Sequence, residues 1–335
     1  MSIIRFEHKM AAHCESGAIT ALLTRAGVKI TEPLVFGIGG GIFFGYLKSR
    51  RFPFPMFVVR SQPGSLRTNV AKRIGVQFKV QRFGSNRPKA QKALDNLIEN
   101  NVPVAAQVDM YFMDYIPAYQ TVHINVHFVV VTGKENGNYS VSDCYYPTIG
   151  VVRESSMMDG RFARGSFAPQ GLLFYPTGVP RDIDWKKAVT AGIKQSVFYM
   201  LKLPIPFLGV RGIRYFADQI LLWPKLARSE DQLAHEFMKI HLLLEEQGTG
   251  GGGFRFIYSS FLQQAEPILG RSELKELSAE MMENGDHWRE LSLFVARLGK
   301  NRDFGNDALQ TVREMLRRRA DAEQKLFSSL ALIVK

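Results

Sequence analysis

The sequence predicts an α+β domain over residues 1–180 and an all-helical domain over residues 181–335. Short apolar runs with strand character alternate with helical patterns before Pro180, whereas helical periodicity alone follows it. The 335 residues suffice for two ordinary domains, and 46% hydrophobic with 22% charged residues is typical of a globular protein with a sizeable core. Composition and periodicity therefore agree on two domains of different class.

The first domain is expected to open with two helices. Residues 14–26 carry four apolar side chains on one face and stop before Gly27, which predicts a helix. Thr31-Glu32-Pro33 has the form of a second helix start, with threonine as the cap and proline in the first turn. A further helix is expected over 85–100. The predicted strands are 54–60, 76–83, 103–112, 123–133, 138–146 and 171–176.

The clearest local signal is a hairpin between the runs 123–133 and 138–146. The four residues between them are KENG, and Asn-Gly favours a tight two-residue turn. In the second domain, aspartates open a helix after Pro180, and another helix begins at Ser229. The stretch GTGGGG at 248–253 predicts either a flexible break or a close-packed turn, and helices with short glycine breaks follow it.

The formal net charge of +12 favours acidic partners. Nucleic acid is not expected among them, because no zinc-finger spacing and no aromatic-basic block accompanies the basic residues. No signal peptide is expected at the N-terminus and no run of about 18 apolar residues predicts a membrane span. Two cysteines do not make a disulfide framework, so we expect a cytoplasmic protein with reduced thiols.

Two other kinds of site are weakly indicated. The stretch FGIGGG at 36–41 lacks the acidic residue that a dinucleotide-binding fingerprint places about 20 residues later, so it predicts close backbone packing instead. His123 and His127 could share a face with Asp109 or Asp143 to hold zinc, but no cysteine–histidine cluster of zinc-like spacing exists. We therefore expect no metal.

Cys14 stands at the predicted start of a helix, where the helix dipole favours a thiolate. A nucleophilic cysteine needs a base, and the base needs an orienting group. His127 and Asp143 lie on the two arms of the predicted hairpin, and the order Cys, His, Asp is the order of papain-like enzymes. Side chains alternate along strands, so these two residues share a face only if the loop has an odd length or a strand contains a bulge.

The stretches HCESGAITALLTRAG, TEPLVFGIGGGIFFGYL and HFVVVTG resemble the N-terminal domain of the family of butirosin biosynthesis acyltransferases typified by BtrH. GGGGFRFIYSSFLQQA and HWRELS resemble the helical C-terminal region of many such proteins. The resemblance implies a papain-like fold and an acyl transfer from a carrier-protein thioester to an amine. It assigns Cys14 as nucleophile, His127 as base and Asp143 as orienting residue.

One feature departs from papain-like enzymes, which place a glutamine several residues before the cysteine to help form the oxyanion hole. The stretch here is FEHKMAAHC, so His8 or His13 is the expected donor together with the Cys14 backbone N–H. Three further residues are candidates for lining the pocket, although an ordinary structural role is equally open to them: Asp109, Tyr111 and His123.

The sequence thus predicts a cysteine-dependent acyltransferase of specialised or lipid metabolism that needs no cofactor beyond the phosphopantetheine of its donor. The expected partners are an acyl carrier protein and an amine or alcohol acceptor. Lys48, Arg50 and Arg51 are the candidate docking residues for the acidic carrier. Two alternatives remain open: a cysteine peptidase or amidase with the same site, and a non-catalytic carrier-binding scaffold.

Overall fold

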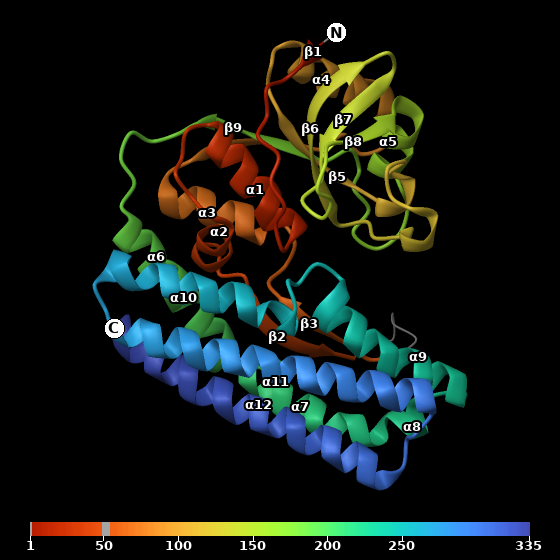
Figure 1. The fold of residues 1–335 in the computed structure, drawn as a ribbon, viewed down its shortest axis with the longest axis vertical. Helices are drawn as coiled ribbons and strands as arrows, with labels where there is room; N and C mark the ends of the chain where they lie inside the picture. The colour runs from red at the N-terminus through yellow and green to blue at the C-terminus, as the bar shows by residue number, and fades with distance from the viewer. Residues whose placement is uncertain (1, 49–53) are drawn as a thin grey trace. The chain divides into compact units, whose positions relative to one another are not determined.

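The computed structural model describes residues 2–48 and 54–335. Its contacts divide the chain into two compact units, one formed by Met1–Val35 with Val70–Ile183 and the other by Phe36–Asn69 with Asp184–Lys335. The first unit is α+β and the second is largely helical (Figure 1). The division after Ile183 lies close to the boundary expected near residue 180. The segment 36–69, however, makes its contacts with the helical unit and is part of it.

A single antiparallel sheet forms the centre of the first unit. Its strands run in the order β4-β9-β5-β6-β7-β8, and β1 pairs with β6. The strands are β1 (Ser2–Ile3), β4 (Gln77–Gln81), β5 (Val104–Val108), β6 (His127–Glu135), β7 (Asn138–Ser142), β8 (Gly150–Arg153) and β9 (Leu173–Gly178). The helices are α1 (Cys14–Arg25), α2 (Glu32–Ile38), α3 (Ser65–Ile74), α4 (Arg87–Glu99) and α5 (Glu154–Arg161), of which α2 and α3 cross from one unit to the other.

Strands β5 and β6 are buried along almost their whole length, as their runs of valine and alanine require. Helix α1 packs against both strands, and α4 and α5 also contact this pair (Figure 1). Apolar side chains from α4, α5 and alternate strand positions form the core of the unit. The β5–β6 pair is therefore a rigid support for residues that follow β5 or begin β6.

In the second unit, long helices carry buried residues every three or four positions, as an amphipathic helix requires. Helix α12 packs against α7 and α11, and α11 packs against α9 and α10 (Figure 1). The helices are α6 (Trp185–Val197), α7 (Gly209–Gln219), α8 (Trp223–Leu226), α9 (Glu230–His241), α10 (Arg255–Leu269), α11 (Glu273–Asn301) and α12 (Asn306–Ile333).

A two-stranded hairpin of β2 (Ile42–Leu47) and β3 (Met56–Arg60) completes this unit. Its aromatic side chains explain why it groups with helices. Phe44, Tyr46 and Phe57 each stack on Phe216 of α7, with ring centroids 5.1–6.3 Å apart. Stacked aromatic pairs add to the stabilisation from buried area, so the hairpin is part of the helical core.

Both glycine-rich stretches are close-packed. A Cβ atom on Gly37 would lie 2.0 Å from a ring carbon of Phe261, and one on Gly41 would lie 2.4 Å from the ring of Phe36. The packing interpretation of 36–41 is therefore confirmed. At the second stretch, residues from Gly250 to Phe254 all have positive φ, and a Cβ on Gly252 would lie 2.9 Å from a backbone oxygen of α11. This stretch is a close-packed turn, not a flexible break.

Candidate active site

Cys14 is the first residue of α1. The preceding residue, His13, caps the helix by accepting a hydrogen bond from the Ser16 N–H at 3.3 Å. The Cys14 side chain is buried, with 7% of the residue exposed. Because the positive end of the helix dipole favours a thiolate, this position suits a nucleophilic sulfur.

The turn that leads into α1 is held by the carboxylate of Glu32. It accepts the N–H of Ala12 at 2.8 Å, the N–H of His13 at 2.9 Å and the hydroxyl of Ser16 at 2.9 Å. Burial raises the pKa of Glu32 above its ordinary value, and the three hydrogen bonds only partly oppose this effect. The sequence indicated Glu32 only as part of a helix start, because a bond spanning some twenty residues leaves no local signal.

His127 and Asp143 form a buried pair beside the thiol. The Nε2 atom of His127 lies 2.7 Å from an Asp143 carboxylate oxygen, and the two side chains are 1% and 0% exposed. The Cys14 side chain helps to raise the pKa of His127, and its sulfur lies 3.6 Å from the carbonyl oxygen of Val126. Since Nε2 faces the carboxylate, Nδ1 is the ring nitrogen left for the sulfur.

The electrostatics of the pair favour an imidazolium. Burial alone would lower the pKa of His127, but the Asp143 carboxylate and the Cys14 side chain outweigh it and raise the pKa to about 10. Burial would likewise raise the pKa of Asp143, but His127 outweighs it, so this pKa lies below its ordinary value. An imidazolium beside a cysteine is the arrangement in which cysteine nucleophiles are commonly activated.

A bulge in β6 brings His127 and Asp143 to one face of the hairpin. Asn136 and Gly137 form a two-residue turn with φ of 50° and 75°, which by itself would leave the pair on opposite faces. The register shifts between Val131 and Gly133, where two steps along β6 oppose one step along β7. Alternation of side chains required either an odd loop or a bulge for His127 and Asp143 to share a face. The structure provides a bulge, at Thr132.

Two tyrosines complete the surroundings of the pair. The Tyr115 hydroxyl donates to Asp143 at 2.7 Å, and the Tyr145 backbone N–H donates to the other carboxylate oxygen at 3.1 Å. The Tyr145 hydroxyl accepts the Cys14 backbone N–H at 3.3 Å, and its ring centroid lies 5.2 Å from that of His127. Neither tyrosine was singled out from the sequence. The only available signal for Tyr145 was its position two residues after Asp143.

Cys144 is as buried as Cys14, each with 7% of the residue exposed, but its electrostatic surroundings differ. Burial raises the pKa of its thiol well above the ordinary value, and the negative groups at Cys14 and Asp143 raise it further. Its sulfur packs against α1, where a Cβ on Gly17 would lie 3.1 Å away. Its carbonyl accepts the Ala11 N–H at 3.0 Å. These contacts assign Cys144 a packing role.

The expected oxyanion role of His8 needs correction. Its two ring nitrogens lie 2.7 Å from the Ser142 hydroxyl and 2.8 Å from the Tyr146 carbonyl oxygen, so neither is left for a substrate. His13 is buried and uses its Nδ1 to cap α1. The hydroxyl of Tyr145, and not a histidine, accepts the hydrogen bond from the Cys14 backbone N–H.

The three pocket candidates form a cluster of their own. Asp109 is buried, and one carboxylate oxygen lies 2.8 Å from Nδ1 of His123. The Tyr111 ring stacks on the His123 ring at 4.1 Å with an interplanar angle of 19°. Asp109 is thus paired with His123 and Asp143 with His127. No group of residues in the described part of the chain has the composition of a metal site.

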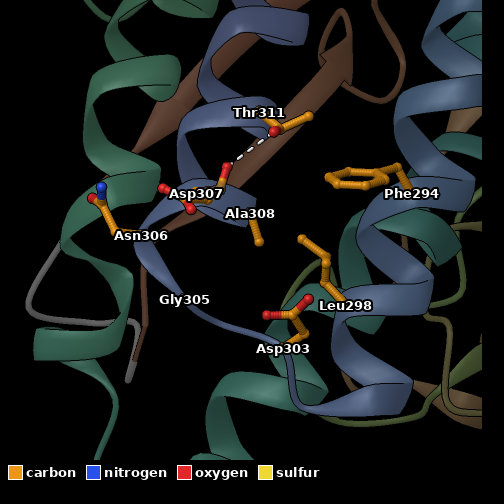
Figure 2. A pocket seen from close by; sticks show the side chains of 8 residues that line it. All are labelled: Phe294, Leu298, Asp303, Gly305, Asn306, Asp307, Ala308 and Thr311. Carbon is orange, nitrogen blue, oxygen red and sulfur yellow. Dashed lines mark hydrogen bonds between the residues drawn. The ribbon is translucent and has the colours of Figure 1, made fainter.

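Of the candidate docking residues, Lys48 is exposed, whereas Arg50 and Arg51 lie outside the described residues. A pocket of about 520 Å³ lies at the turn between α11 and α12 (Figure 2). It is lined by Phe294, Leu298, Asp303, Gly305, Asn306, Asp307, Ala308 and Thr311. This lining contains neither a thiol nor an imidazole, so it carries none of the chemistry of the Cys14 site.

The fold and site define a chain with a cysteine–histidine–aspartate constellation in an α+β unit and a second, largely helical unit. Residues 13–144 match the family model for Butirosin biosynthesis protein H, N-terminal, and residues 155–330 match the Domain of unknown function DUF4872. The second match spans more than half of the chain. The chain therefore belongs to the family defined by this C-terminal domain. Together with the N-terminal match, this places it among the BtrH-like proteins.

The N-terminal family match begins one residue before Cys14 and ends one residue after Asp143, so it contains the whole constellation. The C-terminal match begins in α5, inside the first structural unit. No curated protein matches this chain. Among the described residues, no helix combines the length and the apolar character that a membrane span needs.

Proposed function

We propose that this protein is a papain-like, cysteine-dependent acyltransferase that takes an acyl group from a carrier-protein thioester and passes it to an amine or alcohol. The observation that supports this most is the buried Cys14–His127–Asp143 constellation, with the sulfur at a helix N-terminus and a histidine pKa raised to about 10. Membership in the BtrH-like family favours transfer over hydrolysis. Two free cysteines suit a reducing compartment such as the cytoplasm.

In the first proposed step, the Cys14 thiolate attacks the thioester carbonyl carbon. The new bond joins Cys14 sulfur to the acyl carbon, the donor C–S bond breaks, and the His127 imidazolium gives its proton to the departing thiolate. The Cys14 N–H would donate to the carbonyl oxygen as it becomes negative. The Tyr145 hydroxyl, which now bonds that N–H at 3.3 Å, would turn to donate as well.

In the second step, the acceptor nucleophile attacks the acyl-enzyme. The Cys14–acyl bond breaks, an amide or ester forms, and neutral His127 takes the proton that the nucleophile loses. Asp143 holds the ring orientation in both steps and stabilises the charged form. No ATP is consumed, because the energy comes from the thioester.

The test is acylation of the purified full chain. We expect an N-acetylcysteamine hexanoyl thioester to add one hexanoyl group to the wild type, detected by intact mass and mapped to Cys14. Cys144→Ser is the matched control and should be acylated like the wild type, whereas Cys14→Ala should not. Adduct formation on Cys14→Ala, or none on the wild type, would contradict the proposal.

The same experiment separates the two alternatives. An acyl-enzyme that water resolves as fast as any added amine would indicate a peptidase or amidase. A chain that binds an acyl carrier protein but never carries an acyl group would indicate a scaffold. An acyl-enzyme that persists in water and is discharged by an amine would support the transferase.

A further inference from the structure

The chain that leads into Cys14 is held by one carboxylate at two consecutive backbone N–H groups. The N–H of Ala12 donates to one oxygen of Glu32 at 2.8 Å, and the N–H of His13 donates to the other at 2.9 Å. The next N–H along the chain, that of Cys14, is directed at the Tyr145 hydroxyl, 3.3 Å away. Glu32 thus fixes the backbone immediately before the nucleophile and leaves the N–H of the nucleophile itself directed toward Tyr145.

The same carboxylate also binds the first turn of α1. The Ser16 hydroxyl donates at 2.9 Å to the Glu32 oxygen that accepts the His13 N–H. The three bonds therefore fix residues on both sides of Cys14, and all three use the carboxylate as an acceptor. A carboxylate offers two acceptor oxygens, whereas the amide of a glutamine offers one oxygen and an NH₂ group. The arrangement at residue 32 therefore requires a carboxylate.

The direction of the Cys14 N–H matters when this group stabilises a negative oxygen. A donor lowers the barrier only when it is aimed at the place where the oxyanion forms. The stretch before the nucleophile contains no glutamine and both nitrogens of His8 are bonded, so the backbone donor becomes more important. Because a peptide unit is planar, the direction of this N–H is set by the backbone of His13, which is extended with φ of −141° and ψ of 133°. His13 is in turn held by Glu32 through its own N–H.

The charge of Glu32 does not account for its position. It is one of the negative groups that raise the pKa of Cys144, the thiol that packs against α1. A negative charge near the start of α1 also opposes a thiolate at Cys14. We therefore expect the carboxylate to act through geometry, because its charge works against the nucleophile.

We propose that Glu32 is a positioning residue that aims the Cys14 backbone N–H at the oxygen of the thioester carbonyl. This inference rests on the proposed acyl transfer. As the Cys14 sulfur bonds the carbonyl carbon, an electron pair moves onto that oxygen, and the held N–H donates to the oxyanion. When the pair returns, the C–S bond to the donor breaks, and the departing thiolate takes the proton of His127.

The test compares two reactions of Cys14 in a series of variants at residue 32. The wild type has two acceptor oxygens there, Glu32→Gln has one and Glu32→Ala has none. Acylation by the hexanoyl thioester passes through an oxyanion, so its rate should fall in that order, by about 10²-fold or more in Glu32→Ala. Alkylation by iodoacetamide forms no oxyanion, so its rate at Cys14 should equal or exceed the wild-type rate in both variants.

Glu154→Gln is the matched control, because Glu154 is another first-turn glutamate of a helix. Its carboxylate pairs with Lys134 at 2.7 Å instead of binding the chain before Cys14. Both reactions of this variant should match the wild type. If Glu32→Ala does not fold, Glu32→Gln, which keeps the length of the side chain, decides through the same comparison of acylation with alkylation.

An acylation rate in the folded variants equal to that of the wild type would overturn the inference alone. An equal loss of acylation and alkylation, or failure of both variants to fold, would overturn it too, because Glu32 would then maintain the thiolate or the fold and not the direction of the N–H. Failure of the wild type to form any acyl-enzyme would instead overturn the proposed function, and the inference with it.

Discussion

His127 and His123 each lie within hydrogen-bond distance of an aspartate, but only His127 is buried. The pKa of buried His127 rises from its ordinary 6.5 to about 10, so in the proposed transfer it would be the proton donor for the leaving thiol at neutral pH. Because folding raises this pKa, it contributes to the free energy of unfolding below about pH 6.5, and this contribution is lost as the pH rises through about 10. His123 is largely exposed and lies outside this ion pair.

The raised pKa of His127 predicts the pH dependence of acylation. Thioester attack requires the imidazolium–thiolate pair, so the rate should fall as the pH rises through about 10. Asp143→Asn removes the charge that raises this pKa, so the alkaline fall should move to lower pH and the neutral-pH rate should drop about 10²-fold or more. The measurement is the hexanoyl acylation rate against pH, corrected for uncatalysed hydrolysis.

Asp114→Asn is a suitable control for that profile, because Asp114 is an aspartate of the same unit that is paired with Arg153 instead of a histidine. Its profile should match the wild type. An alkaline fall at the same pH in the wild type and Asp143→Asn would show that His127 does not titrate as the pair geometry implies.

The two cysteines should differ sharply in alkylation. At neutral pH, iodoacetamide reacts with thiolates, and burial together with nearby negative charge keeps Cys144 protonated. Peptide mass analysis should therefore show Cys14 modified well before Cys144, and Asp143→Asn should slow the labelling of Cys14. Preferential labelling of Cys144 would be incompatible with the assignment of the nucleophile.

The sequence singled out Cys14, His127 and Asp143 as candidates, because each stands beside a local signal: a helix start, a strand run and a hairpin turn. Of these, the structure places the His127 ring 2.7 Å from Asp143. It did not reveal Glu32, Tyr115 or Tyr145, whose hydrogen bonds to the site span from about 20 to about 130 residues. Such long-range bonds have no periodicity. The orientation of His8 toward Ser142 was hidden for the same reason.

At the scale of elements, the tight turn and the bulge in β6 act together. The sequence predicted the Asn136-Gly137 turn but not the register shift at Thr132, because β-branched residues fit regular and bulged strands alike. The predicted strand 123–133 begins only at His127, because the Ile124 N–H is taken by the Asp109 side chain. The predicted strand 103–112 ends at Val108, because Asp109 caps a short turn.

In the helical unit, a buried ion pair ties α12 to the start of α10. Glu323 of α12 lies 2.9 Å from the Arg255 guanidinium and also accepts the Trp288 indole N–H at 2.7 Å, and both charged side chains are 0% exposed. Removing one partner leaves a buried charge uncompensated. Glu323→Ala should therefore lower the free energy of unfolding by about 3–5 kcal/mol in urea denaturation.

The same helix provides the control for that measurement. Asp321 pairs with Arg214 at 2.8 Å, but its side chain is 71% exposed. Asp321→Ala should cost at most about 1 kcal/mol, because exposed ion pairs contribute little. Equal losses for the two variants would mean that burial of the Arg255–Glu323 pair does not determine its importance.

At the scale of the whole chain, three divisions fall at different places. The sequence placed the boundary near residue 180, the structural units separate after Ile183, and the family models meet between residues 144 and 155. The sequence could not predict that the segment 36–69 belongs to the helical unit. Its strand pattern is the same whether the aromatic rings stack on a sheet or, as here, on Phe216 of α7.

The net charge of +12 belongs to the whole chain and predicts how a donor reaches it. Acyl carrier proteins are typically acidic, and opposite charges accelerate association, while salt screens them over about 8 Å at physiological ionic strength. Acylation of Cys14 by a hexanoyl carrier protein should therefore slow as salt rises, whereas acylation by the uncharged N-acetylcysteamine thioester should hardly change. Equal salt sensitivity of the two donors would reject electrostatic docking.

The docking cluster around Lys48 can be tested by charge reversal against a matched change elsewhere. The triple variant Lys48→Glu, Arg50→Glu, Arg51→Glu should raise the apparent KM for the carrier and leave kinetics with the small thioester unchanged. A second triple variant reverses three exposed lysines of α6, namely Lys186→Glu, Lys187→Glu and Lys194→Glu, and alters the net charge equally. If both variants raise KM alike, the whole field of the protein guides the carrier. If only the first does, the docking surface includes Lys48, because steering by a local patch is lost only when that patch is reversed.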